Sequence, residues 1–472
     1  MNIRFTNNSD AAVHTDPIAD SFGPEHDGLC MKTRRILLAF LGLLTLAWTW
    51  DAFFLNPIAG DTPWVARTQG IYLTGIWSMG LMSLTMILAT RPAWLEPALG
   101  GMDRVYHLHK WAGILAISLG VAHWLVKLSK SIMKDLIGAA IHKPAKFPAL
   151  DFLQPFHSLG KDVGEWMIYA LIVSLLITLW KAFPYKSWRL LHRAMPILYL
   201  ALVFHTVVLT PATWWVQPLG LIMGVLMLGG SVAAGMALRR RIGVHRRHAG
   251  RIESVRALPS GVTEVECAMD AGWPGHRAGQ FAFVTFDAAE GAHPFTIASA
   301  DQPRTRRLCF QIKALGDYTN GLAQRLRPGQ PVWIEGPYGR FDHRRGGARQ
   351  AWVAGGIGVT PFLAWLESFQ DHPERAPQAD LHYCIRDAAH DPFIERLQTL
   401  CATLPRIRLH VHDASKGQRL DADLLRRQHP QSSDTMDVWF CGPAGLARHL
   451  ESGLRSLGLK DVLVHREAFE MR

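Results

Sequence analysis

The sequence predicts a multidomain protein: a six-helix transmembrane bundle, then a small antiparallel β-barrel, then a parallel-sheet α/β domain. Long uncharged runs crowd residues 36 to 238, short alternating runs punctuated by Gly and Pro follow from about residue 247, and strands then alternate with helices. At 472 residues the chain is too long for a single core. We expect a polar N-terminal tail at 1–32, the bundle at 33–242, the barrel at 247–345 and the α/β domain at 346–472.

Six stretches are apolar over a length that can cross a bilayer, which takes about 20 residues. They run over 35–55, 69–90, 104–127, 163–182, 188–210 and 213–238. The second and sixth carry no charge, whereas Asp51 interrupts the first. Six buried helices of a soluble protein in so short a region are the less favoured alternative. Residues 1–30 are polar and lack the apolar core of a signal peptide.

Charge and cysteine usage indicate the compartment. With the N-terminus inside, the inner ends of the spans hold more Lys and Arg than the outer ends, although a lysine-rich loop at 127–162 weakens the bias. An even number of spans returns the soluble half to the cytoplasm, so we expect a multi-pass protein of the inner or plasma membrane. The net charge of +11 largely flanks apolar segments, so nucleic acid is not an expected partner. The six cysteines show no metal-site spacing and are expected to be free thiols.

Four histidines in two spans form a matched set. His109 and His123 lie fourteen residues apart in the third span, and His192 and His205 lie thirteen apart in the fifth. These spans run in the same direction, so His109 is level with His192 and His123 with His205. The two levels are roughly 20 Å apart along the helices. Two imidazoles at each level are typical of bis-histidine iron in low-spin haem, and intramembrane histidines are functional candidates.

Helical phase supports one pair better than the other. Fourteen residues bring His123 within about 40° of the face of His109. Thirteen residues place His205 off the face of His192 on a straight helix, unless Pro196 between them kinks it. Histidines packed as ordinary polar residues of a bundle are the alternative.

Nearby cations allow two interpretations. Lys110, Arg189 and Arg193 flank the inner histidines, where they either pair with haem propionates or anchor the spans at the inner face. Lys127, one turn beyond His123, either attracts an anionic acceptor or extends to the interface.

Two motifs in the barrel carry a family resemblance. His293-Pro-Phe-Thr-Ile-Ala-Ser299 resembles the flavin-binding signature of ferredoxin–NADP reductase-type modules, in the variant of NADPH oxidases and ferric reductases. The resemblance implies that Thr296 hydrogen-bonds the isoalloxazine of FAD. It also implies that the neighbouring residues hold the ribityl chain and phosphate: His293, Pro294, Phe295 and Ser299. The turn Gly316, Asp317, Tyr318 and Thr319 looks like the family's pyrophosphate turn.

The α/β half carries the nucleotide motifs in family order. A glycine cluster follows a strand and opens a helix, as dinucleotide pyrophosphates require; its residues are Gly355, Gly356, Gly358, Thr360 and Pro361. Arg386 follows the second strand, where it suits the 2′-phosphate of NADPH. The resemblance places Cys441, Gly442 and Pro443 beside the nicotinamide, and Gly336, Pro337 and Tyr338 between the lobes. Phe469, three residues from the end, takes the place of the family's terminal aromatic residue, which stacks on the flavin.

The resemblance covers residues 35 to 472 and is to prokaryotic-type members of the NADPH oxidase and ferric reductase family. It implies a catalytic set of Thr296, Cys441 and Phe469, with FAD, two b-type haems and NADPH as cofactors. Electrons then pass from cytoplasmic NADPH across the bilayer to a small-molecule acceptor, oxygen or a ferric chelate. A quinone or a protein redox partner is the alternative. A proton or ion transporter is a third hypothesis, against which the flavin and nucleotide motifs argue.

Overall fold

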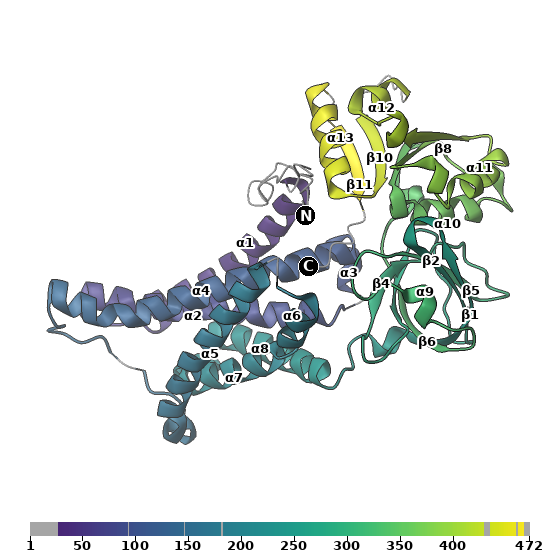
Figure 1. Cartoon of the computed structure of the whole chain (residues 1–472). Coiled ribbons are helices and arrows are strands. Elements are labelled where there is room, and N and C mark those ends of the chain that lie inside the picture. The colour runs from purple at the N-terminus through teal and green to yellow at the C-terminus, as the bar shows by residue number, and fades with distance from the viewer. Residues whose placement is uncertain are drawn as a thin grey trace, which may run out of the picture.

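The computed structural model describes residues 27–92, 94–145, 147–180, 183–428, 435–458 and 461–466. Figure 1 shows an elongated helical bundle, a β-barrel beside one end of it, and an α/β domain next to the barrel. Six of the described helices are long and apolar enough to cross a membrane, as predicted. The bundle comprises α1 (Asp27–Trp50), α2 (Thr62–Ala89), α3 (Leu95–Leu99), α4 (Met102–Ile137), α5 (His157–Leu179), α6 (Tyr185–His192), α7 (Met195–Leu209) and α8 (Pro218–Leu238).

Asp51, the charge in the first span, is buried and hydrogen-bonded rather than exposed. The helix continues past α1 as a π-helical turn, Asp51–Leu55, which buries the carboxylate. Asn56 donates to Asp51 Oδ1 at 2.6 Å and to Gln217 Oε1 at 2.7 Å. A buried carboxylate needs such partners, so this polar cluster ties the end of the first span to the start of α8.

Two spans differ from the simplest expectation. The helix α4 runs to Ile137, ten residues past the predicted end, and stops where Gly138 takes a positive φ of 80°. The fifth span is broken into α6 and α7 at residues 193 and 194, with Pro196 in the first turn of α7. Proline lacks the N–H that would continue the helix from the preceding turn. The helix is thus interrupted between His192 and His205, at the place where the sequence left a kink open.

The barrel is a six-stranded antiparallel sheet in the order β4-β3-β6-β1-β2-β5. A bridge between Ile297 and Phe310 joins its two ends and closes it. The predicted strands at 279–286 and 331–335 are β3 and β6. Its elements are β1 (Arg247–Leu258), β2 (Val262–Met269), β3 (Phe281–Thr285), β4 (His293–Thr296), β5 (Arg307–Lys313), α9 (Leu322–Arg325) and β6 (Pro331–Tyr338).

The α/β domain is a parallel sheet in the order β11-β10-β7-β8-β9, with helices on both faces. The strand order reverses between β7 and β10, and such a switch point is where open α/β sheets bind ligands. The charge-rich β9 and the edge strand β11 were not predicted. The elements are β7 (Arg349–Gly355), α10 (Thr360–Ser368), β8 (Gln378–Ile385), α11 (Ile394–Ala402), β9 (Ile407–Asp413), α12 (Ala422–Gln428), β10 (Thr435–Cys441), α13 (Ala444–Ser456) and β11 (Asp461–Arg466).

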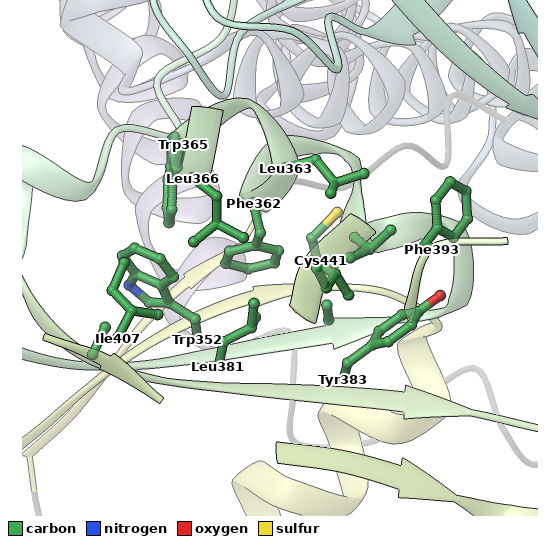
Figure 2. Packing of buried hydrophobic residues seen from close by; sticks show 14 of the residues in the cluster. Trp352, Phe362, Leu363, Trp365, Leu366, Leu381, Tyr383, Phe393, Ile407 and Cys441 are labelled. Carbon is green, nitrogen blue, oxygen red and sulfur yellow. The ribbon is translucent and has the colours of Figure 1, made fainter. Parts of the chain in front are cut away.

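An aromatic cluster joins the α/β core to the barrel. Figure 2 shows Trp352 of β7 beside Phe362 and Trp365 of α10, all fully buried. Phe341, which follows the last barrel strand, stacks on Trp365 with ring centroids 4.8 Å apart, and Trp365 Nε1 donates to the carbonyl of Ala278 at 3.0 Å. Such pairs contribute about 0.5–1.5 kcal/mol beyond their buried area. The two lobes thus share one apolar contact.

Charged residues dock the barrel onto one end of the bundle, which the charge bias predicts to be the inner end. Arg91, just after α2, forms an ion pair with Glu335 of β6 at 3.0 Å, and its guanidinium lies 4.3 Å from the centre of the Phe283 ring. The carboxylate of Glu96 accepts from the backbone N–H of Gly339 at 2.8 Å. These contacts bring the barrel against the level of His109 and His192.

Candidate functional site

One cavity of about 3370 Å³ extends from the inner part of the bundle to the carboxyl edge of the α/β sheet. It is lined by His109 and His192 of the bundle, by strand β4 of the barrel, and by the turns after β7 and β10. Predicted site residues on its wall are His109, His192, His293, Pro294, Phe295, Thr296, Thr319, Gly355, Gly356, Gly358, Thr360, Arg386, Cys441, Gly442 and Pro443. Residues from all three predicted domains therefore face one space.

The inner histidine pair has the spacing of a bis-histidine metal site. The imidazole centroids of His109 and His192 lie 6.1 Å apart. Two metal–nitrogen bonds of about 2 Å each, plus the two ring radii, span about 6 Å. His109 Nδ1 donates to the carbonyl of Thr85 at 3.0 Å, which leaves Nε2 as the free acceptor nitrogen. Trp188 stacks on His192 with centroids 5.1 Å apart and fixes its ring. A haem iron fits between these imidazoles.

The outer histidines are oriented in the same way. His123 Nδ1 donates to the carbonyl of Ile71 at 2.9 Å, and His205 Nδ1 donates to that of Gly160 at 2.7 Å. A ring N–H held by a backbone carbonyl is the usual outer-shell partner of a metal-ligating histidine. A Cβ on Gly164 would overlap the His205 ring, so this glycine makes room for the imidazole. The outer pair does not line the large cavity.

Basic side chains lie near both pairs of histidines. Lys110, Arg189 and Arg193 all line the cavity at the inner level, where they suit anionic groups. Arg189 also donates to the carbonyl of Glu290 in the barrel. At the outer level Lys127 forms an ion pair with Glu165 at 2.7 Å. The inner cations therefore face both domains.

The flavin motif lies on β4, on the side of the barrel that faces the bundle. Thr296 is buried and pairs with Phe281 of β3. His293 stacks on Tyr318 with ring centroids 3.8 Å apart, which brings the motif and the predicted phosphate turn together. Burial, and then the positive charge of Arg189, lower the pKa of His293 to about 4. This imidazole is thus neutral at pH 7.

Some residues that were predicted to bind the flavin are part of the barrel structure and do not line the cavity. Ser299 lies elsewhere, and its hydroxyl accepts from the backbone N–H of Cys309 at 3.1 Å. Thr319 does line the cavity, while its hydroxyl accepts from the N–H groups of Leu315 and Gly316 at 2.9 and 3.2 Å. Further predicted residues that are not part of the described lining are Gly316, Asp317, Tyr318, Gly336, Pro337, Tyr338 and Pro361.

The nucleotide loop depends on glycine because two turns meet at the switch point. A Cβ on Gly355 would lie 2.6 Å from Cδ of Pro443, and one on Gly358 would overlap the carbonyl of Cys441. Gly356 adopts a left-handed φ of 55°. The turn after β7 thus lies directly against the turn after β10, as the family order predicts. The glycine turn leads directly into α10, and a helix N-terminus suits a phosphate.

The comparisons with known proteins divide the chain in the same way. Residues 74–203 match the ferric reductase like transmembrane component, residues 248–342 an FAD-binding domain, and residues 352–452 an oxidoreductase NAD-binding domain. The chain therefore combines a ferric reductase-like transmembrane domain with a ferredoxin–NADP reductase-type module. The ferric reductase-like part is thus followed by domains that match the FAD-binding and NAD-binding domains of oxidoreductases.

Its relatives match in part. The vanillate O-demethylase oxidoreductase of Pseudomonas sp. is 31% identical over 151 residues, covering 32% of this chain and 45% of that protein. That of Pseudomonas putida is 29% identical over 179 residues, covering 37% and 53%. The crystal structure of the Amycolatopsis cytochrome P450 reductase GcoB aligns at 17% identity with a TM-score of 0.41, covering 48% of this chain and 70% of that one. The chain spans about half the length of the curated relatives it matches.

Several residues of the candidate site were not predicted from the sequence. Thr85, Ile71 and Gly160 hold the histidines through backbone carbonyls, which every residue type has, so their side chains give no sign of this role. Gly164 could have been predicted, because a glycine in an apolar span indicates that another group lies close to the helix, here the ring of His205. Arg448, on α13, also lines the nucleotide end of the cavity and was not predicted. Phe469, the predicted flavin-stacking residue, lies outside the described residues and stays a prediction.

Proposed function

We propose that this protein carries electrons from cytoplasmic NADPH through FAD and two b-type haems to oxygen or a ferric chelate at the outer face of the inner or plasma membrane. The observation that carries this proposal is the single cavity that His109, Thr296 and Gly358 share. A nucleotide site, a flavin site and the inner histidine pair open into one space, which is the arrangement a relay of electrons requires.

The order of the sites follows from electron counting. NADPH delivers two electrons as hydride, bound flavin accepts them and releases them singly, and haem iron takes one at a time. On the protein side, the turns at Gly358 and Cys441 hold the nucleotide at the carboxyl edge of the sheet. Thr296 on β4 binds the flavin beside the bundle, and Arg189 spans the bundle and the barrel.

The histidine ladder suits outer-sphere transfer. The Nδ1–carbonyl bonds of His109, His123 and His205 leave Nε2 of each ring to bind iron, and two imidazole ligands would leave a haem iron no open position. We propose His109 with His192 as the inner pair and His123 with His205 as the outer pair. The acceptor then receives electrons at the haem edge, near Lys127. An inside-negative potential assists the outward step by about 2.3 kcal/mol per 100 mV for each charge.

The test uses the full chain, purified with its cofactors in lipid nanodiscs. Anaerobic NADPH should reduce first the flavin and then two low-spin haems, seen in the absorption spectrum. Superoxide dismutase-sensitive reduction of cytochrome c and ferrous-chelate formation then separate oxygen from ferric acceptors, with a soluble quinone as the third arm. Purified protein without haem absorbance would contradict the proposal and favour a transport role for the histidines.

A further inference from the structure

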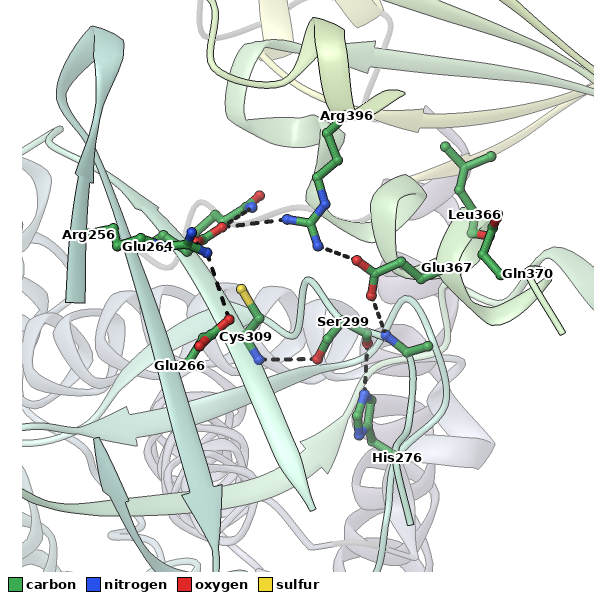
Figure 3. Close-up of polar contacts among 12 residues, drawn as sticks. Arg256, Glu264, Glu266, His276, Ser299, Cys309, Leu366, Glu367, Gln370 and Arg396 are labelled. Carbon is green, nitrogen blue, oxygen red and sulfur yellow. Dashed lines mark hydrogen bonds and ion pairs between the residues drawn. The ribbon is translucent and has the colours of Figure 1, made fainter. Parts of the chain in front are cut away.

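We propose that Arg396 locks the α/β domain onto the barrel in the orientation that hydride transfer needs, an inference that rests on the proposed function. Arg396 lies on α11. Its guanidinium pairs with Glu264 of barrel strand β2 at 3.5 Å and also with Glu367 of α10. Figure 3 shows the guanidinium between the two carboxylates. One side chain thereby ties the barrel to α10 and α11 of the α/β domain, and it is a positioning residue.

The two carboxylates are largely buried, whereas the Arg396 side chain is 35% exposed. The Glu264 side chain is 6% exposed and that of Glu367 is 18% exposed. Glu264 is held further by Arg256 and by Gln311, whose Nε2 donates to it at 3.0 Å. Without the guanidinium of Arg396, Glu264 keeps Arg256 and Gln311, but Glu367 loses its cation and the two carboxylates face each other across the domain boundary. Like charges in such a place repel, so the domains separate on this side.

The helix α10 transmits this position to the nucleotide. It begins at Thr360, directly after the glycine loop, and Glu367 lies seven residues later, about 10 Å along the axis. The other oxygen of Glu367 accepts from the backbone N–H of Ala300 in the barrel at 3.1 Å. The end of α10 remote from the nucleotide is therefore fastened to the flavin-binding domain. Releasing it turns the glycine loop relative to β4.

Charged groups line the boundary here, beside barrel residues Leu258 and Val262, which pack against the α/β core. A second cavity of about 420 Å³ separates the lobes at this point and is lined by Arg396, Glu264 and Glu367. The apolar junction at Phe341 and Trp365 forms a separate contact between the lobes. The boundary thus has an aromatic pivot and a charged clamp.

Arg396→Gln tests the clamp, and Arg307→Gln is the matched control. Arg307 lines the same small cavity, but it pairs with Glu253 of the same barrel at 2.6 Å. Anaerobic stopped-flow with the full, FAD-loaded chain measures the rate of flavin reduction at saturating NADPH and the apparent Kd for NADPH. Because a 1 Å misplacement can cost about 100-fold in rate, we expect R396Q to lower the rate at least tenfold. The Kd should change less than twofold and FAD content should be unchanged.

Two further variants separate positioning from general damage. Arg396→Lys keeps the charge without the planar fork and should recover part of the rate. Glu367→Gln should slow reduction in the same direction, and the double variant with R396Q should be no slower than the worse single variant. Hydrogen exchange should be faster in R396Q at Ala300 and along α10.

The possible outcomes distinguish a failure of the Arg396 proposal from a failure of the proposed function. An unchanged rate in R396Q, an equal loss in R307Q, or a rate loss explained by missing FAD would each overturn the clamp while leaving the proposed function standing. A wild-type chain whose flavin is not reduced by either nicotinamide nucleotide would overturn the proposed function, and the clamp with it.

Discussion

Replacing Arg91 with methionine should loosen the docking of the barrel on the membrane bundle. The Arg91 side chain is 12% exposed and that of Glu335 is 3% exposed, and their charged atoms lie 3.0 Å apart. Methionine keeps an apolar stem over the ring of Phe283 but removes the charge. Glu335 then keeps the hydroxyl of Tyr338, which donates to it at 2.7 Å, and loses its guanidinium partner.

The size of the effect follows from the burial of the pair. Exposed ion pairs contribute about 0–1 kcal/mol, whereas removing one partner of a buried pair costs about 3–5 kcal/mol, because the other charge is left uncompensated. For a unit of 150–250 residues, each kcal/mol lowers the midpoint by about 2–4 °C. Arg91→Met should therefore lower the midpoint of flavin release by roughly 6–20 °C.

Flavin fluorescence during heating of the detergent-solubilised chain measures this midpoint. Anaerobic stopped-flow should also show normal flavin reduction by NADPH followed by slower haem reduction, because the altered contact lies between the flavin and haem domains. Adding Glu335→Gln to Arg91→Met removes the uncompensated charge and should restore part of the midpoint. A shift below 2 °C, or a double variant no better than the single one, would refute the reasoning.

Four further predictions concern the cofactor sites. His109→Leu and His205→Leu should each lose haem, counted as the pyridine haemochrome, while FAD stays bound. Gly358→Ala should weaken NADPH binding about tenfold or more, since overpacking costs roughly 1–3 kcal/mol. Arg386→Ala should raise the KM for NADPH far more than that for NADH, because it removes the contact to the 2′-phosphate. In the folded chain the pKa of His293 is lowered from 6.5 to about 4. As the pH falls, the unfolded chain therefore protonates His293 before the folded chain does, and the free energy of unfolding decreases between pH 6.5 and pH 4. His293→Gln should reduce this decrease.

Each prediction has a control and an opposing result. His107→Leu should keep both haems, because both ring nitrogens of His107 have partners within the bundle, Thr33 at Nδ1 and Trp111 at Nε2, each at 3.1 Å. Two haems retained in both ligand variants would end the ligand assignment. Gly445→Ala meets open space and should bind NADPH normally. Equal losses for both nucleotides in Arg386→Ala would point to Arg419 instead, which also lines the cavity. An unchanged pH profile in His293→Gln would refute the proton argument.

Much of the candidate site could be predicted because its signals are local. An uncharged run of membrane length can bury its backbone only as a helix, so the spans were readable from composition. Glycines at the turn after β7 indicate that another backbone segment lies close to this turn. In the structure that segment is the turn at Cys441, which lies against Gly358. The positions of His109 and His192 along their helices placed them at one level, and their rings lie 6.1 Å apart.

The sequence by itself determined the order of the domains, the six spans, the histidine levels and the nucleotide turns. The tertiary structure decided what depends on distant partners: the carbonyl of Thr85 that orients His109, the docking of Arg91 on Glu335, and the clamp at Arg396. Hydrophobic periodicity and turn chemistry act over a few residues, so they leave a trace in the sequence. A hydrogen bond or ion pair between residues far apart in the chain leaves none, because it exists only once the fold has brought its two ends together.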